Sequence, residues 1–292
     1  MAEVYRARVR SGPRAGQEVA LKRLLPEFAG DPAYVDQFTS EADLSRRLDH
    51  PHVVRVLEVG VHEEIYFMVM ELVDGRDLGQ VIRRCRERGI HLPLDFAVFL
   101  VKALLDALAH AHEVTAPDGR PLEVVHCDVS PSNLFVSRTG EVKLGDFGVA
   151  RARIGGGDTG QLQGKPYYLS PEALDGEITP EVDLWAATVT LYELLTLRRP
   201  FTGATADEVF AQVRERRFAP PSQLRPDVSP ALDEIIDRAF SRRRADRFLS
   251  AREYAARLEP LFDERIGNPM AIAAVVRGLF DAPSGAHPAE RR

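Results

Sequence analysis

The pattern of apolar residues changes once along the chain, near residue 75, and this change constrains the fold more than any other feature. Before it, one helix is predicted at 31–48, and short apolar runs between turn residues predict strands at 4–9, 18–24, 53–60 and 65–73. After it, apolar residues recur at helical spacing at 94–112, 181–196, 205–215, 230–240 and 250–261. A small β-rich part followed by a larger helical part predicts an α+β fold with two lobes.

The same change of pattern sets the expected domain organisation. We expect an N-terminal lobe at 1–73 and a C-terminal lobe at 74–262. The region 263–281 holds one further amphipathic helix, at 269–280, which should pack on the larger lobe. Residues 282–292, rich in Ala, Pro and charge, are expected to form a disordered tail.

Charge and cysteine content argue against several functions. The net charge of −6 and pI near 5.8 provide no basic field for nucleic acid. Cys85 and Cys127 are far apart in a sequence without a CxxC motif, which argues against a disulfide framework or zinc site and suits the cytoplasm. The longest apolar run, 184–195, is shorter than the ~20 residues of a membrane span. No signal peptide precedes Val4, so we expect no membrane segment.

Two short segments carry side-chain oxygens that could bind a metal ion. HCDVSPSN, residues 126–133, contains Asp128 and Asn133, and two predicted short strands separate it from Asp146 in the sequence DFG. Carboxylate and amide oxygens on loops suit Mg²⁺, which is usually shared with substrate phosphates. Taken singly, each of these residues is more often a turn former.

Taken in order, these motifs resemble the eukaryotic-type protein kinase family, which has bacterial members, over nearly the whole chain. The resemblance implies a bilobal kinase fold and transfer of the ATP γ-phosphate, with Mg²⁺, to Ser or Thr of protein substrates. It makes Lys22, in VALK, the lysine that holds the nucleotide phosphates, and Glu41 its helix partner. It makes Asp128 the catalytic base and makes Asn133 and Asp146 the Mg²⁺ ligands.

The resemblance also implies a nucleotide pocket. YFMVMELVDG is similar to the hinge strand of the family, with Met70 as gatekeeper. The other residues implied to bind ATP are the backbone from Glu71 to Val73, the adenine-enclosing Val4, Ala20 and Phe135, and Asp77. On sequence alone, the apolar members of this set could equally be core residues.

Further motifs resemble the parts of the family that support the catalytic loop. LSPE, residues 169–172, is similar to the end of the activation segment, and Arg247 lies where the family places the buried partner of Glu172. Asp183 and Trp185, in VDLWA, match the helix that anchors the catalytic loop.

The glycine-rich loop of the family is the first departure. In MAEV, Val4 matches the valine of that loop and Ala2 its last glycine, so the first two glycines and the preceding strand are missing. We expect a chain truncated within this loop. A natural start at Met1 would leave the phosphates with less backbone cover and weaken ATP binding.

The second departure is Cys127, where most members have an arginine that pairs with a phosphorylated activation segment. Cysteine cannot form that pair. Thr159 is the only hydroxyl in the segment apart from the tyrosines. We therefore expect a kinase of the type that lacks this arginine, with little dependence on phosphorylation of its activation segment.

The third departure is Ser130, where Ser/Thr kinases have a lysine that meets the γ-phosphate. Lys165, in QGKPYYLSPE, occupies the place of a threonine whose hydroxyl bridges the catalytic aspartate and that lysine. Because the two positions face each other in the family fold, we expect hydroxyl and ammonium to have changed sides. Lys165 would reach the phosphate while Ser130 bonds Asp128, which makes both candidate catalytic residues.

Two other functions remain open. The missing loop, Cys127 and Ser130 favour a pseudokinase that acts as a scaffold. Small-molecule phosphotransferases share the His-x-Asp loop but lack the SPE segment and its arginine partner, which makes them the weaker alternative.

Pro131 matches the KPxN style of Ser/Thr kinases, and Ser132 replaces an acidic residue that many arginine-directed members use. The basic clusters at 83–88 and 214–217 could bind an acidic partner, although solvated helix faces are the usual explanation.

Overall fold

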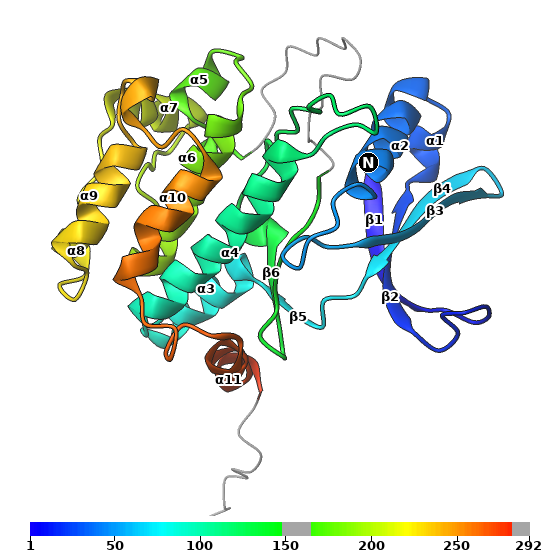
Figure 1. Cartoon of the computed structure of the whole chain (residues 1–292), viewed down its shortest axis with the longest axis horizontal. Helices are drawn as coiled ribbons and strands as arrows, with labels where there is room; N and C mark the ends of the chain where they lie inside the picture. The colour runs from blue at the N-terminus through cyan, green and yellow to red at the C-terminus, as the bar shows by residue number, and fades with distance from the viewer. Residues whose placement is uncertain (148–164, 282–292) are drawn as a thin grey trace, which may run out of the picture.

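The protein, described here by a computed structural model for residues 1–147 and 165–281, consists of two lobes that meet side by side (Figure 1). The smaller lobe is built on an antiparallel sheet with strand order β1-β2-β4-β3. Its strands are β1 (Ala2–Arg8), β2 (Glu18–Leu24), β3 (Val56–His62) and β4 (Ile65–Glu71). The predicted α+β fold with two lobes is thereby confirmed.

Two helices, α1 (Pro26–Ala29) and α2 (Pro32–Ser45), cover one face of this sheet. Asp31 caps α2, because its side chain accepts a hydrogen bond of 2.9 Å from the backbone N–H of Ala33. α2 buries Phe38 and Ala42 against β2 and β4, and these residues form a small core that is separate from the core of the larger lobe.

A second sheet, with strand order β5-β6-β7, belongs to the larger lobe. It consists of β5 (Gly75–Asp77), β6 (Leu134–Ser137) and β7 (Val142–Leu144). Residues 72–74 connect β4 to β5 and thus link the two lobes. A Cβ atom on Gly75 would lie 1.9 Å from the carbonyl oxygen of Val136, so the close approach of β5 to β6 requires glycine.

Helices form the rest of the larger lobe (Figure 1): α3 (Leu78–Arg88), α4 (Leu94–Glu113), α5 (Pro171–Leu174), α6 (Pro180–Thr196), α7 (Ala206–Glu215), α8 (Pro221–Leu224), α9 (Pro230–Ala239) and α10 (Ala251–Leu258). α4 and α6 form the centre of the core, and α6 is buried on nearly every side. The helix expected at 250–261 ends earlier, as α10, and continues as a 3₁₀ turn at Glu259–Leu261. Pro260 lacks the N–H that an α-helix would need at that position.

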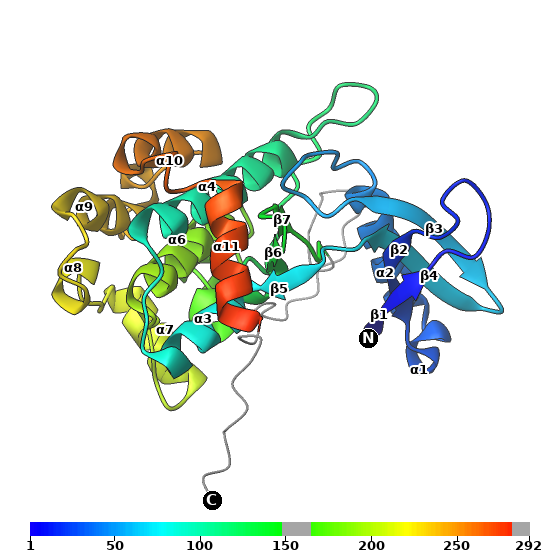
Figure 2. The ribbon, with the colours of Figure 1, turned by 90° about the horizontal axis from the view of Figure 1, so that it is seen from below.

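The helix expected at 269–280 is present as α11 (Pro269–Phe280), which lies against α3 and β6 (Figure 2). It buries Ile272, Ala273, Val276 and Leu279. The turn between β6 and β7 touches its first residue. Gly140 has a φ of +92°, and a Cβ atom there would lie 1.7 Å from the carbonyl oxygen of Pro269. In the described ranges, no helix combines the length and the apolar character that a bilayer crossing requires.

Candidate active site

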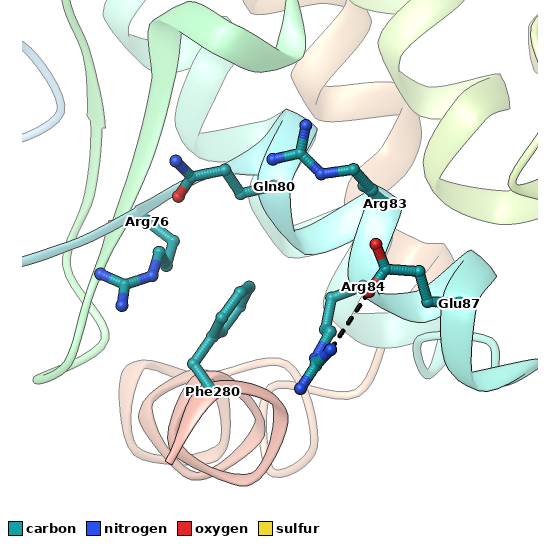
Figure 3. Close-up of a pocket in the computed structure, with 6 residues that line it drawn as sticks. All are labelled: Arg76, Gln80, Arg83, Arg84, Glu87 and Phe280. Carbon is teal, nitrogen blue, oxygen red and sulfur yellow. Dashed lines mark hydrogen bonds and ion pairs between the residues drawn. The ribbon is translucent and has the colours of Figure 1, made fainter. Parts of the chain in front are cut away.

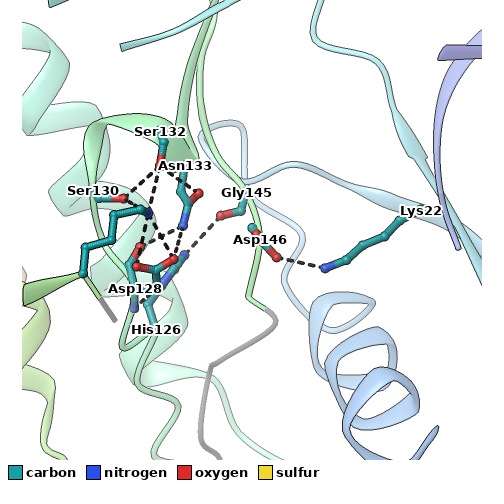
Figure 4. A network of polar contacts seen from close by, with 9 residues as sticks. Lys22, His126, Asp128, Ser130, Ser132, Asn133, Gly145 and Asp146 are labelled. Carbon is teal, nitrogen blue, oxygen red and sulfur yellow. Dashed lines mark hydrogen bonds and ion pairs between the residues drawn. The ribbon is translucent and has the colours of Figure 1, made fainter. Parts of the chain in front are cut away.

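Lys22, on β2, forms an ion pair with Glu41 of α2 at the side of the small lobe that α2 covers. Its Nζ lies 2.5 Å from Glu41 Oε1. The same atom lies 2.9 Å from Asp146 Oδ1, and this contact joins the two lobes (Figure 4). The Lys22 and Glu41 side chains are buried, whereas Asp146 is about half exposed. Burial disfavours the charged form of Lys22, but the two carboxylates more than offset this and raise its pKa. Burial raises the pKa of Glu41, and the ammonium opposes that shift.

Strand pairing explains why the residues expected near the nucleotide share a face with Lys22. Val4 pairs with Lys22 across β1 and β2, and Ala20 pairs with Met70 across β2 and β4. Directly paired residues, and residues two apart on one strand, point to the same face of a sheet. Val4 is 61% exposed, and Ala20 and Met70 are partly buried.

Phe135 reaches the same region from the second sheet. Its ring lies close to Gly145, where a Cβ atom would be 3.1 Å from Phe135 Cε2. Gly145 is next to Asp146 in the chain, so Phe135 of the larger lobe lies near the point where Lys22 and Asp146 join the lobes. The candidate nucleotide site is therefore bounded by one sheet from each lobe.

Side chains at both ends of the connection between the lobes form hydrogen bonds. The carboxylate of Glu71 accepts hydrogen bonds of 2.8 Å from Lys143 Nζ and from the backbone N–H of Arg55. Val73 makes no backbone hydrogen bond within the described residues. Asp77, expected among the nucleotide-binding residues, caps α3 by accepting a bond of 2.8 Å from the N–H of Gln80.

Asp183 holds the start of the HCDVSPSN loop in place. Its buried carboxylate accepts bonds from the backbone N–H groups of His126 (2.8 Å) and Cys127 (2.9 Å), and it contacts His112 Nε2 at 2.9 Å. Cys127 adopts a φ of +64°, a conformation that non-glycine residues rarely take. The buried acceptor therefore fixes the turn that presents Asp128.

Asp128 is oriented from within its own loop. Asn133 Nδ2 donates to the backbone oxygen of Asp128 at 2.8 Å and to Asp128 Oδ2 at 2.9 Å. His126 accepts from the N–H of Asp128 at 3.3 Å and contacts the carbonyl oxygen of Gly145 at 3.2 Å through Nε2. The His126 ring also packs against Phe147, with 4.5 Å between ring centroids. This histidine, which sequence reasoning did not single out, couples the loop to the DFG segment.

The oxygen donors fit Mg²⁺. Asn133 uses its amide nitrogen to hold Asp128, and within the described residues its oxygen has only a long 3.4 Å contact, from the Ser132 hydroxyl. The carboxylate of Asp146 is about half exposed. No group of three or more His, Cys, Asp or Glu side chains in the described ranges could form a cage made of protein alone. One carboxylate and one amide suit an ion completed by water and phosphate.

Lys165, in the segment before α5, also contacts the HCDVSPSN loop. Its Nζ lies 2.8 Å from Ser130 Oγ, 2.9 Å from Ser132 Oγ and 3.4 Å from each carboxylate oxygen of Asp128. Ser130 and Ser132 also bond to each other at 3.2 Å. The expected hydrogen bond from Ser130 to Asp128 is not among the contacts of the described residues, because Lys165 lies between them. Ser132 is the member of this cluster that sequence reasoning missed.

A buried cluster holds the segment that follows Lys165. The Tyr168 hydroxyl donates to Glu193 Oε2 at 2.5 Å, and Arg86 pairs with Glu193 Oε1 at 2.7 Å. Burial, reinforced by this carboxylate, strongly raises the pKa of Tyr168. Further along, Glu172 and Arg247 form a buried ion pair of 2.7 Å. Gly148 and Thr159 lie outside the described residues.

The basic cluster at 83–88 belongs to α3 and largely serves the ends of other helices. Arg84 donates to the carbonyl of Leu279, Arg88 to that of Gly278, and Arg86 to that of Leu197. Such contacts satisfy the last carbonyls of α11 and α6. A pocket of about 400 Å³ lies between α3 and the end of α11 (Figure 3), and its lining residues are Arg76, Gln80, Arg83, Arg84, Glu87 and Phe280. The cluster at 214–217 likewise forms surface ion pairs.

Comparisons with known proteins agree with this geometry. The family described as "Protein kinase domain" matches residues 1–257. Tyrosine-protein kinase MasK of Myxococcus xanthus is 35% identical over 288 residues, covering 96% of this chain and 44% of that protein. Serine/threonine-protein kinase PknL of Mycobacterium tuberculosis is 35% identical over 254 residues, covering 86% of this chain and 61% of that protein. The chain thus spans about half the length of these relatives.

A solved structure shows the same likeness in three dimensions. The crystal structure of the Mycobacterium tuberculosis PknI kinase domain has a TM-score of 0.65 and 28% identity, and the match covers 89% of this chain and 90% of that one. Both the family match and the shared fold extend over most of the sequence. This chain belongs to the protein kinase family.

Proposed function

We propose that this chain transfers the γ-phosphate of ATP, with Mg²⁺, to serine or threonine side chains of protein substrates. The observation that carries the proposal is the joining of two groups across the lobes: the buried Lys22–Glu41 pair contacts Asp146, and Asn133 orients Asp128. Phosphoryl transfer needs positioned charge more than covalent chemistry, and this arrangement provides it.

Each residue has a distinct task in the proposed reaction. Lys22, held by Glu41, binds phosphate oxygens, while Val4, Ala20, Met70 and Phe135 enclose the base of the nucleotide. Asp128 orients the acceptor hydroxyl and accepts its proton. Asn133 and Asp146 hold Mg²⁺, which neutralises charge on the phosphates when bound.

The backbone from Glu71 to Val73, with Asp77, completes the proposed nucleotide site. The Glu71 side chain is turned onto Lys143 and the N–H of Arg55, so it is the backbone of this segment that is offered to the base. Asp77 Oδ1 already caps α3, which leaves Oδ2 for the ribose. Cys85 is a buried thiol outside any disulfide, which is consistent with a reducing cytoplasm.

The acceptor class and the mode of activation belong to the proposal as well. Pro131 begins the 3₁₀ turn that ends at Asn133, and a proline at this place resembles Ser/Thr kinases. PknL is named a serine/threonine-protein kinase, whereas MasK is named a tyrosine-protein kinase. Cys127 replaces the arginine that would bind a phosphorylated activation segment, so we infer little dependence on such phosphorylation.

The test combines nucleotide binding with phosphate transfer. The chain should be stabilised thermally by ATP with Mg²⁺ and should label itself or myelin basic protein on serine and threonine. Asp128→Asn should keep the thermal shift but lower transfer by roughly 10²- to 10⁴-fold, the range for losing a general base. Asp175→Asn, on a surface carboxylate paired with Arg214, is the matched control and should transfer normally.

Three results would revise the proposal. Thermal stabilisation without transfer would favour a pseudokinase scaffold, the alternative that Ser130 and Cys127 suggest. The absence of both thermal stabilisation and phosphate transfer would refute nucleotide chemistry at this site. Label confined to tyrosine would refute the proposed acceptor class while leaving phosphotransfer intact.

A further inference from the structure

The catalytic loop has no cation of its own. Between Asp128 and Asn133 the chain has Val129, Ser130, Pro131 and Ser132, and the residue before Asp128 is Cys127. During transfer, negative charge spreads over the phosphoryl oxygens next to the acceptor hydroxyl, and the base that receives the proton is itself an anion. Besides Lys22 and the proposed Mg²⁺, any cation next to the acceptor hydroxyl therefore has to come from another segment of the fold.

Lys165 is the cation that the structure brings to this place. Its ammonium lies 2.8 Å from Ser130 Oγ and 2.9 Å from Ser132 Oγ, both good hydrogen-bond distances. Its contacts with the two Asp128 oxygens are 3.4 Å each, longer than a well-formed bond. An ammonium has three donors, so two are held by hydroxyls while the third faces the carboxylate loosely. That third donor is the one a phosphate oxygen can take.

The backbone that carries Lys165 is fixed by its neighbours. Pro166 starts a 3₁₀ turn, Tyr168 in that turn bonds to the buried Glu193, and Arg199 stacks on Tyr167 at 4.1 Å. The Lys165 side chain is 43% exposed, so one side contacts the serines and the other is open to an incoming ligand. A rigid base with a partly open ammonium is the arrangement that a charge-stabilising group needs.

The composition of the chain supports a specific need for lysine here. Of 38 basic residues only four are lysines, at positions 22, 102, 143 and 165, and the other 34 are arginines. Two of the four, Lys22 and Lys165, are at the candidate active site. A compact ammonium with rotatable donors can serve two hydroxyls and a carboxylate that converge on one point, whereas the planar fork of arginine cannot.

We propose that Lys165 is a catalytic residue that meets the transferring phosphate from the segment before α5, and that Ser130 and Ser132 are positioning residues for its ammonium. In the step, the acceptor oxygen forms a bond to the γ-phosphorus while the bond to the bridging oxygen breaks. ADP leaves with that electron pair, and the hydroxyl proton passes to Asp128. Lys165 balances the charge on the phosphoryl oxygens. This inference rests on the proposed kinase function.

The first experiment measures kcat, KM for ATP, KM for the protein substrate and melting temperature of Lys165→Ala in the full chain. We expect kcat to fall by roughly 10²-fold, the scale for losing one preorganised charge donor. KM for ATP and the melting temperature should change little, because the side chain is partly exposed and its third donor acts on the phosphoryl group in transit. Lys102→Ala, in a lysine that packs on Phe262 away from the loop, is the control and should keep kcat.

The second experiment separates positioning from charge. Ser130→Ala and Ser132→Ala should each lower kcat by about threefold to tenfold, the scale of one hydrogen bond. The exchange Ser130→Lys with Lys165→Thr should recover much of the rate lost in Lys165→Ala, because it restores a cation from the other side. A merely structural role for Lys165 would not be rescued in this way.

The outcomes distinguish this inference from the proposed function. An active parent with an equally active Lys165→Ala variant overturns the inference alone. So does a loss that appears only in melting temperature, or only in KM for the protein substrate. A parent chain that binds ATP and Mg²⁺ but transfers no phosphate overturns both proposals together.

Discussion

Arg247→Ala tests how much the fold depends on the ion pair that closes the segment after Lys165. Arg247 Nη1 lies 2.7 Å from Glu172 Oε1, and both side chains are about 95% buried. Arg247 also donates from Nε to the carbonyl oxygen of Ser241 at 2.7 Å and stacks on the Trp185 ring at 4.8 Å. The substitution therefore leaves a buried carboxylate and a carbonyl without their donor.

The expected loss of unfolding free energy is about 3–5 kcal/mol, the range for removing one partner of a buried ion pair. A change of 1 kcal/mol shifts the melting temperature of a large domain by about 2–4 °C, so we expect a fall of roughly 6–20 °C. Most of this loss of stability arises because the Glu172 carboxylate stays buried without its ion-pair partner. Removing both charges, by Glu172→Met with Arg247→Met, should recover part of the loss.

The assay is thermal and urea unfolding of the parent and of a matched surface variant. Arg252 forms a pair of similar length, 2.6 Å, with Glu113, but both side chains are more than half exposed. Arg252→Ala should unfold like the parent, because exposed pairs contribute little. If Arg247→Ala were as mild as Arg252→Ala, burial would not be what gives the Glu172 pair its importance, and the reasoning would be wrong.

Three further predictions concern activity and pH. Thr159→Ala, in the segment outside the described residues, should leave turnover nearly intact, and a tenfold fall would contradict independence from phosphorylation. A peptide array should show no dominant arginine requirement before the acceptor, since Ser132 offers no carboxylate there; a strict arginine preference would argue against this. Burial, with His110 and His52 nearby, lowers the pKa of His50, so its folded pKa lies below its unfolded value. Stability is then present above about pH 6.5 and lost on acidification. The melting temperature should fall between pH 7 and pH 5.5, and His50→Gln should weaken that dependence; an unchanged slope would exclude His50 as the cause.

The long elements could be predicted because burial of one face leaves a periodic pattern. α9 shows this best, since its buried residues, Leu232, Ile235, Ile236 and Ala239, line one face. α3 was missed although its signals are present: Asp77 caps it, Gly89 ends it in a left-handed conformation, and Leu78, Val81, Ile82 and Cys85 form a buried stripe. The four arginines of the helix hide that stripe in a search for apolar runs.

The candidate site was harder to predict from the sequence than the fold was. Lys22 and Glu41 are 19 residues apart, and nothing in their spacing predicts contact, because it depends on α2 packing on the sheet. Only the resemblance to kinases paired them. The contacts of Glu193 with Tyr168 and Arg86 link residues 25 and 107 positions apart, so no local pattern could have shown them. Ser130 and Lys165 were foreseen because each departs from the kinase pattern in a complementary way.

Three of the contacts that hold residues 165–172 on the larger lobe divide stability from catalysis. Tyr168 with Glu193 and Glu172 with Arg247 are buried, whereas Lys165 with the serines is partly open. The buried pairs can hold this part of the chain without a phosphate, since neither uses a group that must first be modified. Arg247→Ala should therefore lower the melting temperature while the molecules that remain folded turn over normally. Lys165→Ala should lower turnover and leave the melting temperature nearly unchanged. Equal effects of both variants on both quantities would mean that anchoring and charge stabilisation are one function here rather than two.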